Sequence, residues 1–532
     1  MVVKIIIVIL YLGVIGYLGF LGYKNTKTTK DYLIGGRKIH PAVMALSYGA
    51  TFISTSAIVG FGGTAGVFGF SLLWLTFLNI FLGVFIAFVV FGKRTRKMGH
   101  NMEAHTFPEF LGKRYNSKFI QKFAGVVIFL FMPVYTAAVM IGASKFIESS
   151  LNIDYNIALF VFAIIVAAYV FFGGLKGVMY SDAFQGTIMF VGMSILIVAV
   201  YSKLGGVTAA HQKLTELFTN PAIAEQIKGI SSLGHEGWTA MPKLFSTYWW
   251  IVVSSIVMGV GIGVLAQPQL AVRFMTVKSD RELNRAIPIG GIFILMMTGV
   301  AFLVGALSNV LFFESTGTIA VVAAKGTDGI IPMFLNDFMP EWYVTIFLVV
   351  LLAAGMSTIS SQLHAIGTAV GRDLFNTEGK SEKKGMLISR LGVLVAIIVT
   401  IFLAYWLPEV WDGAIAISTG LFFGLCGASF LPMYFAALFS KKISKAAAIS
   451  GMVSGFTVSM IWMMFFHTKE SSVLKVSELI FGKPALVSGM INVVDPIIIA
   501  LSTSILVTLI VAWATKSKLD DKHVEACFKG IK

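Results

Sequence analysis

The chain has 532 residues, of which 57% are apolar or aromatic and only 13% are charged, and its mean hydropathy is +0.85. Soluble globular proteins carry about 25% charged residues, so this composition leaves too little polar surface and predicts an integral membrane protein in a lipid bilayer. The two cysteines, Cys426 and Cys527, and the lack of His or Cys at ligand spacing exclude a disulfide scaffold and a zinc module.

Thirteen apolar stretches are each long enough to cross the bilayer core, which takes about 20 helical residues. They are 4–24, 41–67, 70–92, 120–148, 154–173, 180–203, 245–270, 286–313, 342–372, 386–407, 413–438, 444–467 and 494–515. The first runs past 18 residues without a small-residue cleavage site, so we predict a span there rather than a signal peptide. The sequence thus predicts an all-α membrane protein with 13 transmembrane helices.

The distribution of basic residues favours one orientation. With the N-terminus outside, 31 of the 41 Lys and Arg residues fall in segments on the cytoplasmic side. Cytoplasmic loops of membrane proteins are enriched in these residues. We therefore expect the N-terminus outside and the C-terminus in the cytoplasm, and the net charge of +15 needs no nucleic-acid partner.

The second and seventh stretches contain more small and polar residues than the others. The interruptions are Ser47, Gly49, Ser54, Ser56, Gly60, Gly62, Gly63 and Gly66 in the second stretch and Ser254, Ser255, Gly259, Gly261 and Gly263 in the seventh. Interrupted helices at matching positions of two halves indicate a transporter binding site. The alternative is that small residues only allow close helix packing.

This spacing predicts two five-helix units of opposite topology. The expected organisation is an N-terminal helix and cytoplasmic linker (1–40), a first repeat (41–203), an extracellular loop (204–244), an inverted second repeat (245–438), and two C-terminal helices with a short cytoplasmic tail (439–532). Each repeat would open with one of the interrupted helices.

The ninth stretch holds the densest group of intramembrane oxygens: Ser357, Thr358, Ser360, Ser361 and Gln362. A lone Ser or Thr usually bonds back to its own helix, which accounts for one or two of these side chains but not all five. A hard monovalent cation needs several oxygen ligands, and unwound carbonyls with hydroxyls supply them in transporters. Ser357 and Thr358 are therefore candidate ligands, with carbonyls from the second helix.

The chain has no nucleophile elbow, P-loop or zinc-protease pair, so no enzyme is predicted.

Several short motifs occur in a fixed order along the chain. They are Asp31-Tyr32-Leu33-Ile34-Gly35-Gly36-Arg37, Thr106-Phe107-Pro108-Glu109-Phe110 with Arg114-Tyr115, Gly173-Gly174-Leu175-Lys176-Gly177-Val178 with Asp182 and Gln185, Gln267-Pro268 with Arg273-Phe274, and Ser357-Thr358 leading to Arg372-Asp373-Leu374. Together they resemble the sodium/solute symporter family from about residue 31 to 440. Members take up proline, pantothenate, sugars, sialic acid or monocarboxylates. The resemblance implies the inverted five-helix repeat of the bacterial leucine transporter.

The resemblance also implies ion sites. A first sodium would bind backbone carbonyls of Ala50, Ile53 and Ala354 and the hydroxyls of Ser357 and Thr358.

In some relatives, the sialic acid carriers among them, a second sodium lies between an aspartate and serines. The matching residues here are Asp182, Ser357, Ser360 and Ser361. The alternative interpretation of Asp182 is a helix-capping acid in water.

Sodium is the expected coupling ion. A proton-coupled carrier needs a titratable group in the pathway, but the second stretch has no acid and the ninth offers only His364 before its terminal Asp373. A passive channel would show charged rings or filter loops, which the sequence lacks.

The solute is expected to be a small organic molecule bearing a carboxylate, because hydroxyls and helix N-termini suit such a group. Candidate solute-binding residues are Thr55, Ser56, Ala57, Thr76, Tyr135, Trp249, Ser254 and Gln362. Sugar-carrying relatives place an amide and an acid where this chain has Ala57 and Thr76, so a sugar is disfavoured. The alternative is that half of these residues only pack helices and that the Trp residues anchor the membrane interface.

Overall fold

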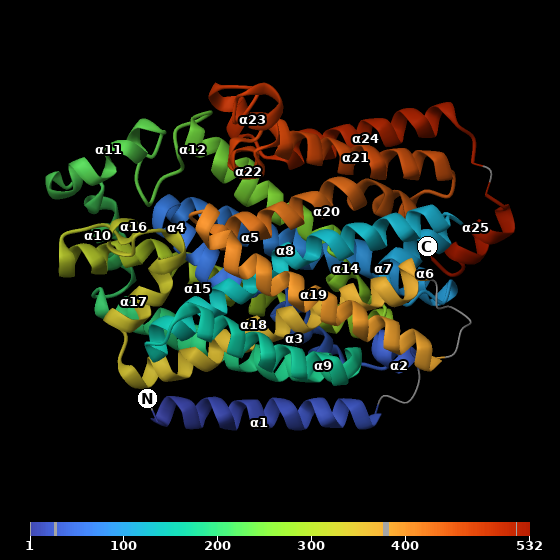
Figure 1. The fold of residues 1–532 in the computed structure, drawn as a ribbon, viewed down its shortest axis with the longest axis horizontal. Helices are drawn as coiled ribbons and strands as arrows, with labels where there is room; N and C mark the ends of the chain where they lie inside the picture. Colours follow the sequence, from blue (N-terminus) through green and yellow to red (C-terminus); the bar gives the residue numbers. More distant parts are fainter. Residues whose placement is uncertain (1, 26–28, 376–381, 518, 532) are drawn as a thin grey trace.

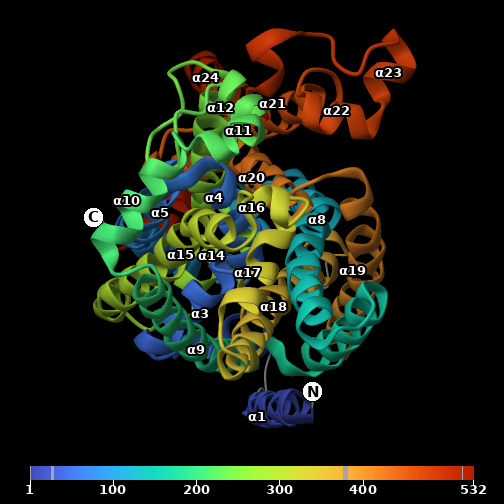
Figure 2. The same ribbon diagram turned by 90° about the vertical axis from the view of Figure 1, so that its left-hand side faces the viewer.

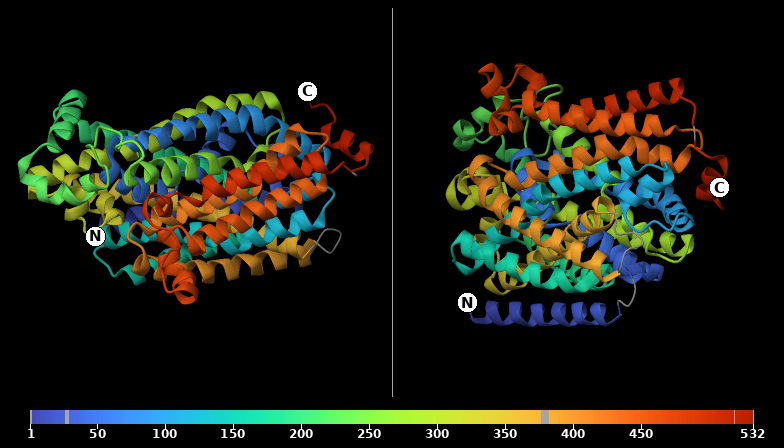
Figure 3. Two further views of the ribbon diagram at one scale, coloured as in Figure 1. Left: turned by 90° about the horizontal axis from the view of Figure 1, so that it is seen from above. Right: turned by 45° about the vertical axis from the view of Figure 1, so that its right-hand side comes forward.

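Helices form all of the regular secondary structure in the part of the chain that the structure describes (Figure 1). The structure is a computed structural model, and it describes residues 2–25, 29–375, 382–517 and 519–531. Apolar segments in lipid satisfy their backbone groups within the helix, which is why these runs become helices. Most of the long helices lie roughly along one axis, and the two chain ends lie at opposite ends of this bundle (Figures 1 and 3).

The elements fall into three groups. The long helices are α1 (Val2–Asn25), α8 (Lys118–Leu151), α9 (Tyr155–Lys203), α15 (Asp280–Thr316), α18 (Glu341–Thr368), α19 (Glu382–Val410), α20 (Ala414–Phe439), α21 (Lys445–Phe465) and α24 (Pro496–Ala514). The shorter bundle segments are α3 (Pro41–Phe52), η2 (Ser56–Phe61), α4 (Gly62–Phe68), η3 (Gly69–Leu72), α5 (Leu73–Ile80), η4 (Phe81–Gly92), α12 (Thr247–Trp250), η6 (Ile251–Val260), α13 (Gly261–Gly263), η7 (Val264–Ala266), α14 (Pro268–Phe274) and η9 (Ala369–Leu374). The peripheral segments are α2 (Thr29–Ile34), η1 (Gly35–Arg37), α6 (Lys93–Asn101), α7 (Phe107–Arg114), α10 (Val207–Leu217), η5 (Pro221–Ile223), α11 (Ala224–Ser232), α16 (Ala320–Ala323), η8 (Thr327–Gly329), α17 (Ile330–Phe338), α22 (Thr468–Leu474), α23 (Val476–Phe481), η10 (Gly489–Val493) and α25 (Asp521–Phe528).

Eleven helices of the described residues are long and apolar enough to cross a membrane, against the thirteen stretches expected. The stretches 41–67 and 70–92 contribute one qualifying run, Ser56–Asn101, because α3 is only 12 residues long. The stretch 154–173 contributes the shorter apolar segment Tyr155–Ala167. The expected number of thirteen spans therefore stays a prediction.

The two ends of α9 run antiparallel. Phe162, near its start, packs against Gly355 of α18, and Gly192, near its end, lies against Val350 of the same helix. The hydroxyl of Tyr343 also donates to the carbonyl of Gly192 at 2.8 Å. Both ends of α9 thus pack against the part of α18 between Tyr343 and Gly355, so the chain reverses its direction between the segments expected at 154–173 and 180–203.

The second expected helix is broken near its middle. α3 ends at Phe52, and Ile53 is extended, with φ −94° and ψ 98°. Beyond the break the Ser54 hydroxyl accepts a hydrogen bond from the amide of Ser56 at 3.1 Å. Such short side chains satisfy local backbone groups and compete with helix formation. The break therefore follows from the Ser-rich sequence noted above.

The seventh expected helix also breaks, but later than its glycine-rich part. Gln267 is extended, with φ −71° and ψ 117°, between η7 and α14. It precedes Pro268, and a residue before proline is driven out of the helical region by the proline ring. The expectation of a break within 254–263 is therefore wrong in position, although η6 there has π-helical geometry.

Helices outside the central bundle mark its two sides. α1 lies alone along one side, and the paired helices α21 and α24 lie along the opposite side (Figures 1 and 2). The helices α10 and α11, between the two expected repeats, lie at the end of the bundle that holds the N-terminus, whereas α6 and α25 lie at the other end (Figure 1).

Candidate ion and solute sites

The broken helix brings backbone carbonyls against the hydroxyls of α18. The Ser357 hydroxyl donates to the carbonyls of Ala50, at 2.9 Å, and Ala354, at 3.2 Å. The Thr358 hydroxyl donates to the carbonyls of Ala50, at 3.3 Å, and Thr51, at 3.2 Å. Ala50, Ala354, Ser357 and Thr358 are fully buried. Four of the five residues expected at the first sodium site thus form one oxygen cluster.

Two carbonyls differ from the expected set. The carbonyl of Ile53, whose backbone is extended at the break, accepts no hydrogen bond from Ser357 or Thr358. The carbonyl of Thr51, which the sequence did not single out, takes that place. Its position two residues before the break is the signal that would have indicated it.

The chemistry of this first cluster suits a hard monovalent cation. A hydroxyl can offer a lone pair to a bound cation when its proton rotates away from that cation. The carbonyl oxygens can offer their lone pairs without any rotation. In the described residues, no group of three His, Cys, Asp or Glu side chains could hold a metal ion.

Asp182, on α9, lies in a second cluster that faces the next turn of α18. Its carboxylate is fully buried, so the interpretation as a capping acid in water is wrong. One oxygen, Oδ2, accepts hydrogen bonds from the hydroxyls of Ser47 at 2.8 Å, Thr51 at 3.3 Å and Ser361 at 3.4 Å. Thr51 therefore belongs to both clusters, through its carbonyl in the first and its hydroxyl in the second.

A buried guanidinium completes the second cluster. Arg273 of α14 is 1% exposed, and its Nη2 atom lies 3.0 Å from Asp182 Oδ2. The same side chain donates to the hydroxyls of Ser47 at 3.1 Å and Ser361 at 2.6 Å. The protein thus supplies its own cation beside the oxygens expected to bind a second sodium. The Ser360 hydroxyl instead donates within its own helix.

A central cavity of about 20 Å³ lies at the break of the second helix. Its lining residues are Phe52, Ile53, Ser54, Ala57, Phe61, Leu75, Asn79, Tyr135, Val260, Thr298, Phe302, Thr419 and Phe423. Of the expected solute-binding residues, Ala57 and Tyr135 line it. The segment that supplies carbonyls to the ion cluster therefore continues directly into the cavity wall.

Three of the expected solute-binding residues have partners elsewhere in the protein, between helices for Thr55 and within one segment for Ser254 and Trp249. The Thr55 hydroxyl donates to the carbonyl of Val139 at 2.5 Å. The Ser254 hydroxyl donates to the carbonyl of Trp250 at 2.5 Å. Trp249 is half-buried and its ring lies 4.9 Å from that of Trp250. The contacts of these three residues agree with the alternative that they only pack helices.

The remaining three, Ser56, Thr76 and Gln362, have a different character. Their side chains are buried, and the Ser56 and Thr76 hydroxyls and both amide atoms of Gln362 have no hydrogen-bond partner in the described part of the protein. Unpaired buried polar atoms are uncommon in native structures. These side chains keep hydrogen-bonding capacity for a solute, an ion or water.

The sequence analysis missed Asn79, a cavity residue one helical turn after Thr76. Its side chain is 2% exposed, and its Oδ1 atom has no hydrogen-bond partner in the described residues. Residues three apart share a helix face, so Thr76 could have pointed to it. Asn79 supplies an amide to the lining from a position other than Ala57 and Thr76, and the expectation that the solute is not a sugar stays a prediction.

Two motifs of the sequence meet at the end of the bundle that holds the C-terminus. Arg372 pairs with the buried carboxylate of Glu109 at 2.7 Å, and Asp373 accepts a hydrogen bond from Thr106 at 2.9 Å. Burial raises the pKa of Glu109, but hydrogen bonds from His105 and Arg372 outweigh this and hold it well below its usual range. The contacts tie α7 to the end of α18.

Broken helices, a neutral oxygen cluster and an adjoining cavity define a multi-pass membrane carrier. The sequence pattern of the sodium:solute symporter family matches residues 32–455. A curated relative, the sodium/proline symporter of Staphylococcus aureus, is 30% identical over 504 residues, covering 91% of this chain and 88% of the relative. The chain belongs to the sodium:solute symporter family.

The solved structures agree with this assignment at the level of the fold. The structure of a Na⁺-coupled sialic acid symporter in a substrate-bound outward-open state matches with a TM-score of 0.74. The match has 19% sequence identity and covers 97% of this chain and 99% of that one. The expected leucine-transporter-like, all-α fold is thereby confirmed. The chain is a sodium-coupled symporter of a small solute, with sodium as the coupling ion, and not an enzyme.

Proposed function

We propose that sodium binds in the first cluster, at Ala50, Ile53, Ala354, Ser357 and Thr358, and that a small carboxylate-bearing solute binds at the central cavity, which at about 20 Å³ has room for one or two waters and must widen to admit the solute. One observation carries the proposal: the break after Phe52 contributes to both places. Ala50 lies in the ion cluster, and Ile53 and Ala57 line the cavity. An ion that orders this segment also orders the solute site, so sodium binding raises the affinity for the solute. The solute then raises the affinity for sodium by the same factor, because coupling between two binding sites is reciprocal.

A carboxylate is supported by the polar groups of the break. Ser54 lines the cavity, and its backbone amide has no hydrogen-bond acceptor in the described residues. The amides at an interrupted helix carry partial positive charge that favours an anion. The rings of Tyr135 and Phe423 lie 5.2 Å apart in the same wall and can cover an apolar remainder.

No Lys or Arg lines the central cavity in the described residues, which suits a zwitterion such as proline as well as a monocarboxylate. The 30% identity to a protein named a sodium/proline symporter supports the first of these. The unpaired Asn79 amide makes a neutral polyol the second candidate. Thr55, Ser56, Thr76, Trp249, Ser254 and Gln362 stay candidate solute residues through rearrangement during transport.

A second sodium at Asp182, Ser357, Ser360 and Ser361 is a further part of the proposal. Arg273 pairs with Oδ2 of Asp182, whereas Oδ1 is buried and has no hydrogen-bond partner in the described residues. Oδ1 is therefore the carboxylate oxygen that is left for a second cation.

The proposed organisation keeps the two repeats at 41–203 and 245–438, flanked by 1–40, 204–244 and 439–532. The breaks at Ile53 and Gln267, one in the first helix of each repeat, support it. We place the N-terminus outside and the C-terminus in the cytoplasm. The basic helix α6 lies at the same end as the C-terminus, in keeping with the enrichment of basic residues on the cytoplasmic side (Figure 1).

Transport by the full chain in proteoliposomes tests the function. An inward sodium gradient should drive uptake of labelled proline or lactate, and an equal potassium gradient should not. The panel also contains acetate, pyruvate, pantothenate and galactose. Sodium-driven uptake of galactose alone would contradict the carboxylate and support the polyol.

A further inference from the structure

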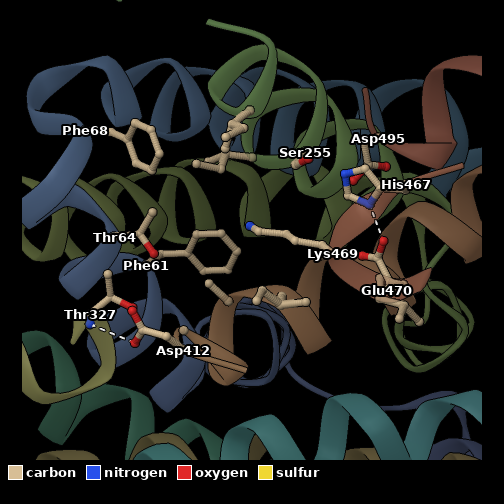
Figure 4. Close-up of a pocket in the computed structure, with 17 residues that line it drawn as sticks. Phe61, Thr64, Phe68, Ser255, Thr327, Asp412, His467, Lys469, Glu470 and Asp495 are labelled. Atoms are coloured by element: carbon tan, nitrogen blue, oxygen red, sulfur yellow. Dashed lines mark hydrogen bonds and ion pairs between the residues drawn. The ribbon is translucent and has the colours of Figure 1, made fainter. Parts of the chain in front are cut away.

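A larger cavity, of about 120 Å³, lies outside the central one (Figure 4). Its walls come from the broken helix, η6, the start of α20 and the segment that follows α21. A water molecule needs roughly 10–15 Å³ by the same measure. The cavity therefore has room for about ten waters, or for one small organic solute in their place.

Lys469 is the cationic side chain that extends furthest into this cavity (Figure 4). Its backbone is held, because the Trp411 indole donates to the carbonyl of Lys469 at 3.0 Å. In the described part of the chain, its ammonium makes no ion pair within 4.0 Å, and the carboxylates of Glu470, Asp495 and Asp412 stabilise its charge from further away. An ammonium in this situation is a ready donor to an anionic oxygen, in the stronger, charge-assisted class of hydrogen bonds.

Three carboxylates also line the cavity, and each has a partner within the protein. Glu470 pairs with the His467 ring, and Asp495 Oδ1 accepts a hydrogen bond from the first turn of α24 at 3.0 Å. Asp412 Oδ1 accepts one from a backbone amide at 3.3 Å. A simple anion would meet repulsion from these acids. A zwitterion avoids it, because its amino group can face an acid while its carboxylate meets Lys469.

We propose that this cavity is an outer binding site for a small zwitterionic solute, an amino acid whose carboxylate pairs with Lys469 and whose amino group faces Asp412. The two side chains enter from different walls (Figure 4). Phe61 lines both this cavity and the central one, so its ring lies between them on one path. The inference rests on the proposed function, because it takes sodium-driven uptake of a carboxylate-bearing solute as given.

Uptake kinetics of the full-length protein in proteoliposomes test the outer site, with labelled L-proline as the zwitterion and labelled lactate as the anion. Lys469→Gln should raise the KM for external proline about tenfold, as expected for one lost charge-assisted hydrogen bond. Vmax and the sodium concentration for half-maximal uptake should stay within twofold of wild type. Lys469→Arg should restore the KM, and Lys475→Gln, six residues on and outside the cavity lining, is the matched control.

A second variant separates the two charges. Asp412→Asn should raise the KM for proline and leave or lower the KM for lactate, since only the zwitterion presents an amino group. An unchanged proline KM in both Lys469→Gln and Asp412→Asn, with normal sodium-driven uptake, would overturn the outer site alone. Absence of sodium-driven uptake of every carboxylate by wild-type protein would overturn the proposed function instead.

Discussion

Two oxygen clusters lie against successive turns of α18, and they differ in charge. The first consists of carbonyls and the hydroxyls of Ser357 and Thr358, and none of its hydrogen bonds, which are 2.9–3.3 Å long, involves a charged group. The second holds the carboxylate of Asp182 and the guanidinium of Arg273 at 3.0 Å. The neutral first cluster is suited to a cation, such as sodium, that binds and is released. The second cluster already contains a cation, the guanidinium of Arg273.

Thr51 joins the two clusters. Its carbonyl accepts from Thr358 at 3.2 Å, and its hydroxyl lies 3.3 Å from Asp182 Oδ2. A change of cation in either cluster therefore acts on the residue beside the helix break. The predictions below test whether the first cluster serves ion binding and the second serves stability.

The largest effect is expected from Arg273→Gln. Removing one partner of a buried ion pair leaves Asp182 uncompensated, at a cost of about 3–5 kcal/mol. Thermal unfolding in detergent, followed in sodium and in potassium, measures this. The double variant Asp182→Asn/Arg273→Gln should be more stable than the single one. Wild-type stability of Arg273→Gln would show that the pair does not hold the second cluster together.

The next effect concerns the double variant Ser357→Ala/Thr358→Ala. It removes two oxygen ligands, each worth about 1–1.5 kcal/mol, and should raise the sodium concentration for half-maximal transport about 100-fold. Thr345→Ala is the matched control on the same helix, because its hydroxyl bonds only to its own helix at 2.8 Å. An unchanged sodium dependence in the well-expressed double variant would exclude the first site.

A smaller effect is expected at Thr51, the residue that the two clusters share. Thr51→Val removes the hydroxyl that reaches Asp182 but keeps the carbonyl that faces Thr358. The same hydroxyl also accepts a hydrogen bond from Arg273 at 2.5 Å and bonds with the Ser361 hydroxyl at 2.9 Å. We expect a loss of about 2 kcal/mol in stability, because these buried partners are left unsatisfied, with little change in sodium dependence. A large change in sodium dependence instead would mean that the two clusters act as one site.

The smallest effect is expected from Ser360→Ala. Its hydroxyl donates to the carbonyl of Ser357 at 3.1 Å within its own helix and does not contact Asp182. Because Ser360 is one of four residues proposed for the second sodium, sodium affinity, measured by titration of the purified protein, should fall about threefold, as expected for one weak oxygen ligand. An unchanged affinity would exclude Ser360 from the second site.

The sequence predicted the ion cluster better than the solute cavity. Ser357 and Thr358 were identified because several oxygens in an apolar helix exceed what back-bonding explains, and both do face Ala50. Asn79 was missed because a single amide in an apolar run has many ordinary explanations. Arg273 was noted in a motif, but its contact with Asp182 joins residues 91 positions apart.

The sequence by itself determined the class of the protein. Long apolar runs in lipid have no alternative to helix, and interrupted helices at matching positions of two halves indicate the binding site of a transporter. Only the tertiary structure decided which oxygens meet. The break at Ile53 sets the direction of the chain beyond it, and the crossing of α3, α14 and α18 brings Arg273 rather than water to Asp182. Such contacts depend on packing between distant segments, and no local pattern encodes the distance between them.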